Sequence, residues 1–204
     1  GAVNSINWAR LMAQVVYYFY AGLQLGAPER AAAYSVPTGN FGDVFAGYVA
    51  NRMGLPIEKL IVATNINDIL HRALKDGDYS AGSVTPTITP SMDIQVSSNF
   101  ERLLFDAGGR DGAAMAAQMV SFEAEKAMQL TNSQRENAAA IFASASADPD
   151  ATTKAMQWAQ RNAGQIIDPH TAVGLPASLA LRADGTVPRG VPLVTLGPAH
   201  PAKL

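Results

Sequence analysis

The chain has 204 residues, of which 48% are hydrophobic and 16% are charged. This composition is typical of a globular protein with one large core or two small ones, and it excludes a disordered chain. The formal net charge is −2, and the 15 lysine and arginine residues are scattered. We therefore expect no basic surface for nucleic acid or membrane. The absence of cysteine excludes disulfides and thiolate chemistry and is compatible with a cytoplasmic protein.

The N-terminal segment is predicted to be a long buried helix that begins after an N-cap at Asn4 or Ser5 and extends to Gly26. Apolar residues recur on more than one face of this helix, which is typical of burial in a large core. The two apolar stripes are Ile6, Ala9, Ala13, Val16, Tyr20 and Leu23, and Trp8, Leu11, Val15 and Phe19. Arg10 and Gln14 leave the apolar run too short for a membrane span. We expect further protein sequence before this helix.

The most informative segment is the glycine-rich turn at residues 36–43, which follows a predicted strand and opens a predicted helix. From Phe41 onwards, apolar residues recur at helical spacing. Gly39 and Gly42 allow the backbone to approach a ligand, and the N–H groups at the helix start attract an anion. The local pattern fits an ordinary tight turn equally well. A phosphate-bearing ligand is the leading hypothesis.

A second strand-to-helix unit follows the first. Residues 60–64 are a continuous apolar run, and residues 65–68 lead into a helix that begins near Ile69. Repetition of strand, helix and strand predicts a right-handed crossover in a parallel sheet. Both turns would then lie at the carboxyl edge of the sheet, where open α/β sheets bind ligands.

The middle of the chain is assigned from composition and from helix start signals. Residues 77–90 are predicted to be loop, and Ser98 or Asn99 is the predicted N-cap of the next helix. Residues 112–163 are predicted to be mostly alanine-rich helix, with a capping box at residues 133–136.

The last part of the chain is predicted to return to the sheet. Asp148-Pro149 and Asp168-Pro169 each mark a helix start, and residues 192–196 form the final strand. The predicted division is an α/β domain at residues 1–106, a helical region at 107–165, and a final helix and strand of the α/β domain at 166–204.

Six segments, taken together, resemble threonine synthases of the bacterial and fungal type. They occur in the order of that family and span essentially the whole chain: residues 4–10, 36–43, 63–70, 90–105, 168–174 and 199–203. The resemblance implies an α/β fold of the tryptophan synthase β-like type, with parallel-sheet layers flanked by helices and an additional helical region. It also implies pyridoxal 5′-phosphate as cofactor and the conversion of O-phospho-L-homoserine and water to L-threonine and phosphate.

The same resemblance assigns the glycine-rich turn to the cofactor phosphate, which backbone N–H groups would hold. The implied cofactor-binding residues are Thr38, Gly39, Asn40, Phe41, Gly42 and Asp43. Thr38 is a possible hydroxyl donor, and Asn40 is the residue whose side chain would matter.

No catalytic residue is assigned to this chain, because the lysine that holds the cofactor covalently lies in an N-terminal motif of the family that has no counterpart here. The lysines present are Lys59, Lys75, Lys126, Lys154 and Lys203. We therefore expect the chain to be the C-terminal half of the enzyme and to be inactive without its N-terminal half. The family also has threonine where this chain has Pro198, at a place suited to the cofactor's pyridine nitrogen, and it has phenylalanine in place of Leu204.

Candidates for substrate binding come from the middle motif and from two histidines. They are Ser91, Asp93, Asn99, Arg102, His170 and His200. Arg102 is suited to pairing with an anion, and an ordinary helix-surface pair with Glu101 or a packing contact explains it equally well. Structural hydrogen bonding explains the two histidines equally well. The third histidine, His71, is predicted to lie on the surface, and the spacing of the three does not indicate a metal site.

Two other functions stay open. The chain fits a related pyridoxal-phosphate lyase that acts on phosphorylated amino acids, and it fits a non-catalytic fragment or paralogue that keeps a phosphate site. The missing lysine discriminates between the synthase and the non-catalytic protein. Sequence before Gly1 that contains this lysine supports the synthase, and a natural start near Gly1 favours the non-catalytic protein.

Overall fold

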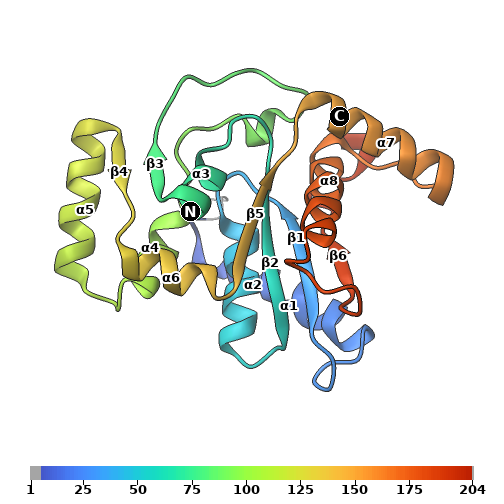
Figure 1. The fold of residues 1–204 in the computed structure, drawn as a ribbon, viewed down its shortest axis with the longest axis horizontal. Helices are drawn as coiled ribbons and strands as arrows, with labels where there is room; N and C mark the ends of the chain where they lie inside the picture. The colour runs from blue at the N-terminus through green and yellow to red at the C-terminus, as the bar shows by residue number, and fades with distance from the viewer. Residues whose placement is uncertain (1–5, 204) are drawn as a thin grey trace.

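A four-stranded parallel sheet forms the centre of the molecule, in a computed structural model that describes residues 6–203 (Figure 1). Its strands, in spatial order, are β5 (Phe142–Ser146), β2 (Ile57–Thr64), β1 (Ala32–Pro37) and β6 (Leu193–Thr195). Every neighbouring pair is parallel, and β1 is buried along its whole length. Such continuous burial is typical of parallel strands covered on both faces. The predicted α/β class is confirmed.

Helices cover both faces of this sheet. Because successive strand residues point to opposite faces, each strand contributes side chains to two apolar clusters. On one face, Tyr34 and Leu60 belong to a large apolar cluster that includes α1 and α2; on the other, Ala33 and Ile61 belong to a smaller cluster with α8. The helices concerned are α1 (Trp8–Gln24), α2 (Gly42–Arg52), α7 (Pro149–Ala163) and α8 (Pro169–Ala183). α7 packs on α8, and both lie to the right of the sheet in Figure 1.

A smaller group of elements lies beyond β5, to the left in Figure 1. It contains α3 (Ile69–Asp76), α4 (Phe100–Ala107), α5 (Gly112–Glu125), α6 (Asn132–Ala139) and an antiparallel pair of strands, β3 (Asp78–Ser80) and β4 (Ala127–Gln129). Short 3-10 turns occupy Pro90–Met92 and Pro201–Lys203. None of the helices within residues 6–203 is long and apolar enough to cross a membrane.

The first helix differs from its prediction. Its N-cap is Asn7, whose side chain accepts a hydrogen bond from the N–H of Ala9; Asn4 and Ser5 lie outside the described residues. The buried residues of the helix are Leu11, Val15, Tyr18 and Gly22. The predicted stripe through Val16 is exposed, with 62% of that residue accessible. Burial all round is therefore wrong for this chain, because α1 packs against α2 through one face only.

The prediction of mostly helix at residues 112–163 is wrong at β4 and β5. β5 belongs to the central sheet, where its five residues pair with Leu60 to Thr64 of β2. Its small alanine and serine residues resemble those of the flanking helices, so pairing with β2 rather than local propensity decides the conformation. The capping box lies at Thr131 and Gln134 rather than at residues 133–136. The predicted loop at 77–90 also contains β3.

Candidate phosphate site

The glycine-rich turn joins the carboxyl end of β1 to the N-terminus of α2. Phe41 precedes α2 with a φ of 65°, a left-handed conformation that is uncommon for a residue other than glycine. Its ring is fully buried, with centroids 5.1 Å from Phe100 and 5.7 Å from Phe142. Burial of the aromatic ring thus offsets the backbone strain at Phe41. A left-handed residue in such a turn is typical of a concave anion-binding backbone.

The backbone N–H groups of this turn are available to a ligand. Those of Gly39, Asn40 and Phe41 form no hydrogen bond with any residue in the range 6–203. Gly39 is partly exposed and Asn40 is exposed, whereas Phe41 is buried. Unpaired N–H groups before the first turn of a helix form an anion site. The turn therefore fits a phosphate group.

The carbonyl groups of Gly39 and Asn40 are bound by protein donors. The Ser97 hydroxyl donates to the carbonyl of Gly39 at 2.8 Å, and Asn99 donates to the carbonyl of Asn40 through its N–H at 3.1 Å and its Nδ2 at 3.0 Å. The carbonyl of Ala63 on β2 accepts from Thr38 N–H at 2.8 Å. These contacts fix the turn so that the lone pairs of its oxygens face protein rather than a bound anion.

Two predicted cofactor residues use their side chains within the turn. The Thr38 hydroxyl donates to the carbonyl of Val36 at 2.6 Å, and Oδ1 of Asn40 accepts from the N–H of Gly42 at 3.1 Å. Asn40 therefore shapes the turn through an Asx-type bond. Contact of either side chain with a ligand stays a prediction.

Asp43 stands in the first turn of α2, beside the candidate anion site. The Tyr18 hydroxyl donates to the main-chain oxygen of Asp43 at 2.9 Å and to its Oδ1 at 3.2 Å. Burial raises the pKa of Asp43 to about 6, and the bond from Tyr18 acts in the opposite direction. Asp43 is thus more readily neutralised than an exposed aspartate, which reduces its repulsion of a nearby phosphate at mildly acidic pH.

Ser91 lies directly against the glycine turn. A Cβ placed on Gly39 would be 2.8 Å from the Ser91 carbonyl oxygen. The N–H of Ser91 donates to Nε2 of His170 at 3.4 Å, and Nδ1 of His170 bonds Oδ1 of the fully buried Asp168 at 3.0 Å. His170 and Ser91 are therefore brought together beside the turn. Asp168 was predicted only as a helix start, and its contact with His170 depends on the tertiary fold.

Asp93 is occupied by protein donors. Its carboxylate accepts hydrogen bonds from Nδ2 of Asn65 at 2.7 Å, Nδ2 of Asn67 at 3.0 Å, and both the N–H and the hydroxyl of Thr87 at 2.7 Å. This network fixes the loop before Asp93 over the carboxyl end of β2. Direct substrate binding by Asp93 is not supported by these contacts and stays a prediction.

Arg102 does not form the expected surface pair with Glu101. Its Nε donates to Oδ1 of Asn99 at 3.0 Å, its Nη2 donates to the carbonyl of Ile6 at 3.0 Å, and its guanidinium lies 5.3 Å from the centre of the Trp8 ring. Arg102 thus connects α4 to the start of α1 and contacts the residue that anchors the turn.

The C-terminal candidate His200 follows β6, the strand that pairs with β1 on the side away from β2. His200 is exposed, and its Nδ1 accepts from the N–H of Ala202 at 3.1 Å. Near Pro198, the hydroxyl of Thr195 lies 3.1 Å from that of Ser178, so it has a protein partner. A role of His200 at the site stays a prediction.

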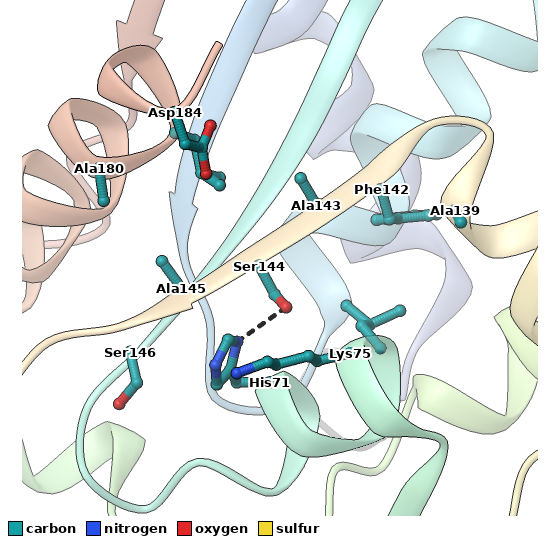
Figure 2. A pocket seen from close by; sticks show the side chains of 12 residues that line it. His71, Lys75, Ala139, Phe142, Ala143, Ser144, Ala145, Ser146, Ala180 and Asp184 are labelled. Atoms are coloured by element: carbon teal, nitrogen blue, oxygen red, sulfur yellow. Dashed lines mark hydrogen bonds between the residues drawn. The ribbon is translucent and has the colours of Figure 1, made fainter. Parts of the chain in front are cut away.

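A cavity of about 510 Å³ lies elsewhere, along the edge strand β5 (Figure 2). His71, Lys75, Ser144 and Asp184 are among its lining residues, and none of the predicted site residues is. Nδ1 of His71 lies 2.9 Å from the Ser144 hydroxyl, as the dashed line shows. The predicted surface location of His71 is wrong, because the ring is partly buried. This burial lowers the pKa of His71, and Lys75 has a smaller effect in the same direction.

Among the described residues, no cluster suited to a metal ion occurs.

Comparison with known proteins places this geometry in a class. The chain superposes on a pyridoxal 5′-phosphate-dependent aspartate racemase with a TM-score of 0.58 at 12% identity, over 94% of this chain and 50% of that one. At this identity the likeness shows a shared fold. No family model matches the chain.

Closer relatives are threonine synthases. The chain is 52% identical over 202 residues to threonine synthase of Pseudomonas aeruginosa, covering 99% of this chain and 42% of the relative. It matches the structure of pyridoxal-phosphate-bound threonine synthase from Brucella melitensis with a TM-score of 0.93 and 50% identity, over 100% of this chain and 43% of that one. The chain is thus homologous over its whole length to threonine synthases and spans about two-fifths of the length of these relatives.

Proposed function

We propose that this chain is part of a threonine synthase, which converts O-phospho-L-homoserine and water to L-threonine and phosphate with pyridoxal 5′-phosphate as cofactor. The observation that carries the proposal is the turn at residues 39–41, where three unpaired backbone N–H groups fit a phosphate at the start of a helix. Homology to threonine synthases along the whole chain supports the identity of that phosphate.

In this proposal the chain binds and orients the cofactor. The N–H groups of Gly39, Asn40 and Phe41 hold its phosphate, and α2 directs the positive end of its dipole at the same group. When bound, the cofactor supplies an electron sink for carbon acids of the substrate. Open α/β sheets generally bind ligands at the carboxyl ends of their strands, which supports a ligand position near the ends of β1 and β2, next to the segment that contains Ser91.

We further propose that the rest of the enzyme packs on the exposed face of α1 and supplies the covalent lysine. The support is the length that this chain leaves unmatched in its relatives, together with the apolar character of that face. Its exposed apolar residues are Trp8, Met12, Val16, Tyr17, Tyr20 and Leu23. An exposed apolar surface of this extent is typical of an interface. Inactivity of this chain alone, and a cytoplasmic setting, stay predictions.

The test is an assay of the full-length protein. After addition of pyridoxal phosphate, we expect release of inorganic phosphate and formation of L-threonine from O-phospho-L-homoserine in equal amounts. A protein that binds the cofactor and forms neither product contradicts the synthase function. Release of phosphate from other phosphorylated amino acids, without activity on O-phospho-L-homoserine, would instead favour the related lyase.

A further inference from the structure

Asn99 is a fully buried amide between the glycine turn and the N-terminal helix. Its Nδ2 and its own N–H both donate to the carbonyl of Asn40, and its Oδ1 accepts from Nε of Arg102. Because a guanidinium only donates, Arg102 determines which end of the amide is the oxygen. The Nδ2 group is consequently directed at the turn.

These bonds determine the direction of the Phe41 N–H, one of the groups of the candidate anion site. The carbonyl of Asn40 and the N–H of Phe41 belong to one planar trans peptide and point in opposite directions. Two donors on the carbonyl therefore turn the Phe41 N–H away from Asn99. The Ser97 hydroxyl acts in the same way on the next peptide, since its bond to the Gly39 carbonyl directs the N–H of Asn40.

We propose that Asn99 is a positioning residue for phosphate binding, and that Arg102 acts through Asn99 rather than on an anion. The proposal rests on the proposed cofactor function of the turn. It reassigns two residues that the sequence indicated as substrate ligands. Arg102 has its own anchors in the carbonyl of Ile6 and the ring of Trp8, which hold its guanidinium in place beside Asn99.

The test compares the dissociation constants of pyridoxal phosphate and of pyridoxal, which lacks the phosphate, for the full-length protein. Asn99→Ala is expected to weaken pyridoxal phosphate binding about tenfold, the worth of one well-placed hydrogen bond, and to leave pyridoxal binding unchanged. The matched control is Asn137→Ala, because Asn137 also donates its Nδ2 to a carbonyl, that of Ala107 at 2.8 Å. It should leave both constants unchanged.

Arg102→Gln keeps the buried amide of Asn99 and provides a second variant if Asn99→Ala does not fold. We expect it to reduce the preference for pyridoxal phosphate about threefold. In the double variant, the loss should equal that of Asn99→Ala alone, because both residues act on one carbonyl. Additive losses would overturn the role of Arg102 and assign it to the phosphate directly.

The remaining outcomes separate this inference from the proposed function. A wild-type protein without preference for pyridoxal phosphate over pyridoxal contradicts phosphate binding by the turn, and both proposals then fail. A wild-type preference that persists in folded Asn99→Ala and in Arg102→Gln leaves the proposed function intact and overturns the positioning role.

Discussion

Replacement of Gly39 by alanine should disturb the phosphate site through a single steric contact. The φ of Gly39 lies outside the left-handed region, so alanine is not excluded by the backbone. Its new Cβ would, however, lie 2.8 Å from the carbonyl oxygen of Ser91, and ordinary contacts begin near 3.4 Å. The turn and the Ser91 segment must therefore separate by about 0.6 Å, against the bond that ties Ser91 to His170.

The magnitude follows from two opposing effects. Overpacking of a close contact costs about 1–3 kcal/mol, and the gain from replacing glycine in the unfolded chain offsets about 0.4–1 kcal/mol of it. We expect Gly39→Ala to lower the free energy of unfolding by about 1–2 kcal/mol. Because the displaced atoms carry the phosphate-binding N–H groups, the affinity for pyridoxal phosphate should fall at least about tenfold.

Denaturant unfolding and cofactor titration of the full-length protein measure these two effects separately. Gly112→Ala is the control, since nothing lies within 4 Å of a Cβ at this helix-start glycine. It should preserve cofactor affinity and should not reduce stability. The reasoning is refuted if Gly39→Ala retains wild-type affinity and stability, because the close approach of Ser91 would then have no consequence.

Three further predictions concern other contacts. The pKa of Asp43 is raised to about 6, so the folded protein binds a proton there more tightly than the unfolded chain does. The free energy of unfolding should therefore fall as pH rises from about 4 to 6. Asp43→Asn should remove this pH dependence, as measured by denaturant unfolding at several pH values. Asp168→Asn should cost about 2–3 kcal/mol in denaturant unfolding, because Asp168 is buried and bonds His170. Asp148→Asn at the exposed cap should have little effect, since asparagine caps a helix as well as aspartate does. Val16→Glu and Tyr20→Lys should leave this chain's own stability unchanged and weaken its association with the rest of the enzyme, measured by co-purification.

Local chemistry made the sheet and the turn predictable. The glycine-rich turn indicated β1 before it, and the continuous apolar run at residues 60–64 indicated β2. The Asp-Pro pairs marked α7 and α8, because the proline lies at the first helical position. The resemblance to threonine synthases added the identity of the ligand. Each of these signals lies within a few consecutive residues.

Features that depend on distant partners were not predictable in this way. β5 has a sequence of small residues, Phe142 to Ser146, and becomes a strand because β2 offers an unpaired edge. The buried face of α1 was overestimated, because periodicity counts apolar residues without showing which of them this chain covers. The contact of His71 with Ser144 of β5 likewise depends on the tertiary fold, since the two residues lie 73 positions apart in the sequence.

The phosphate site itself combines both kinds of information. The glycines that allow a close approach are local, but the groups that direct its N–H donors come from Ser97 and Asn99, which lie 58 and 59 residues after their acceptors. A glycine-rich turn without these donors would be free to rotate its peptides, and its carbonyl oxygens would then face the anion. The sequence motif therefore indicates the candidate phosphate site, whereas the contacts from residues 97–99 depend on the tertiary fold.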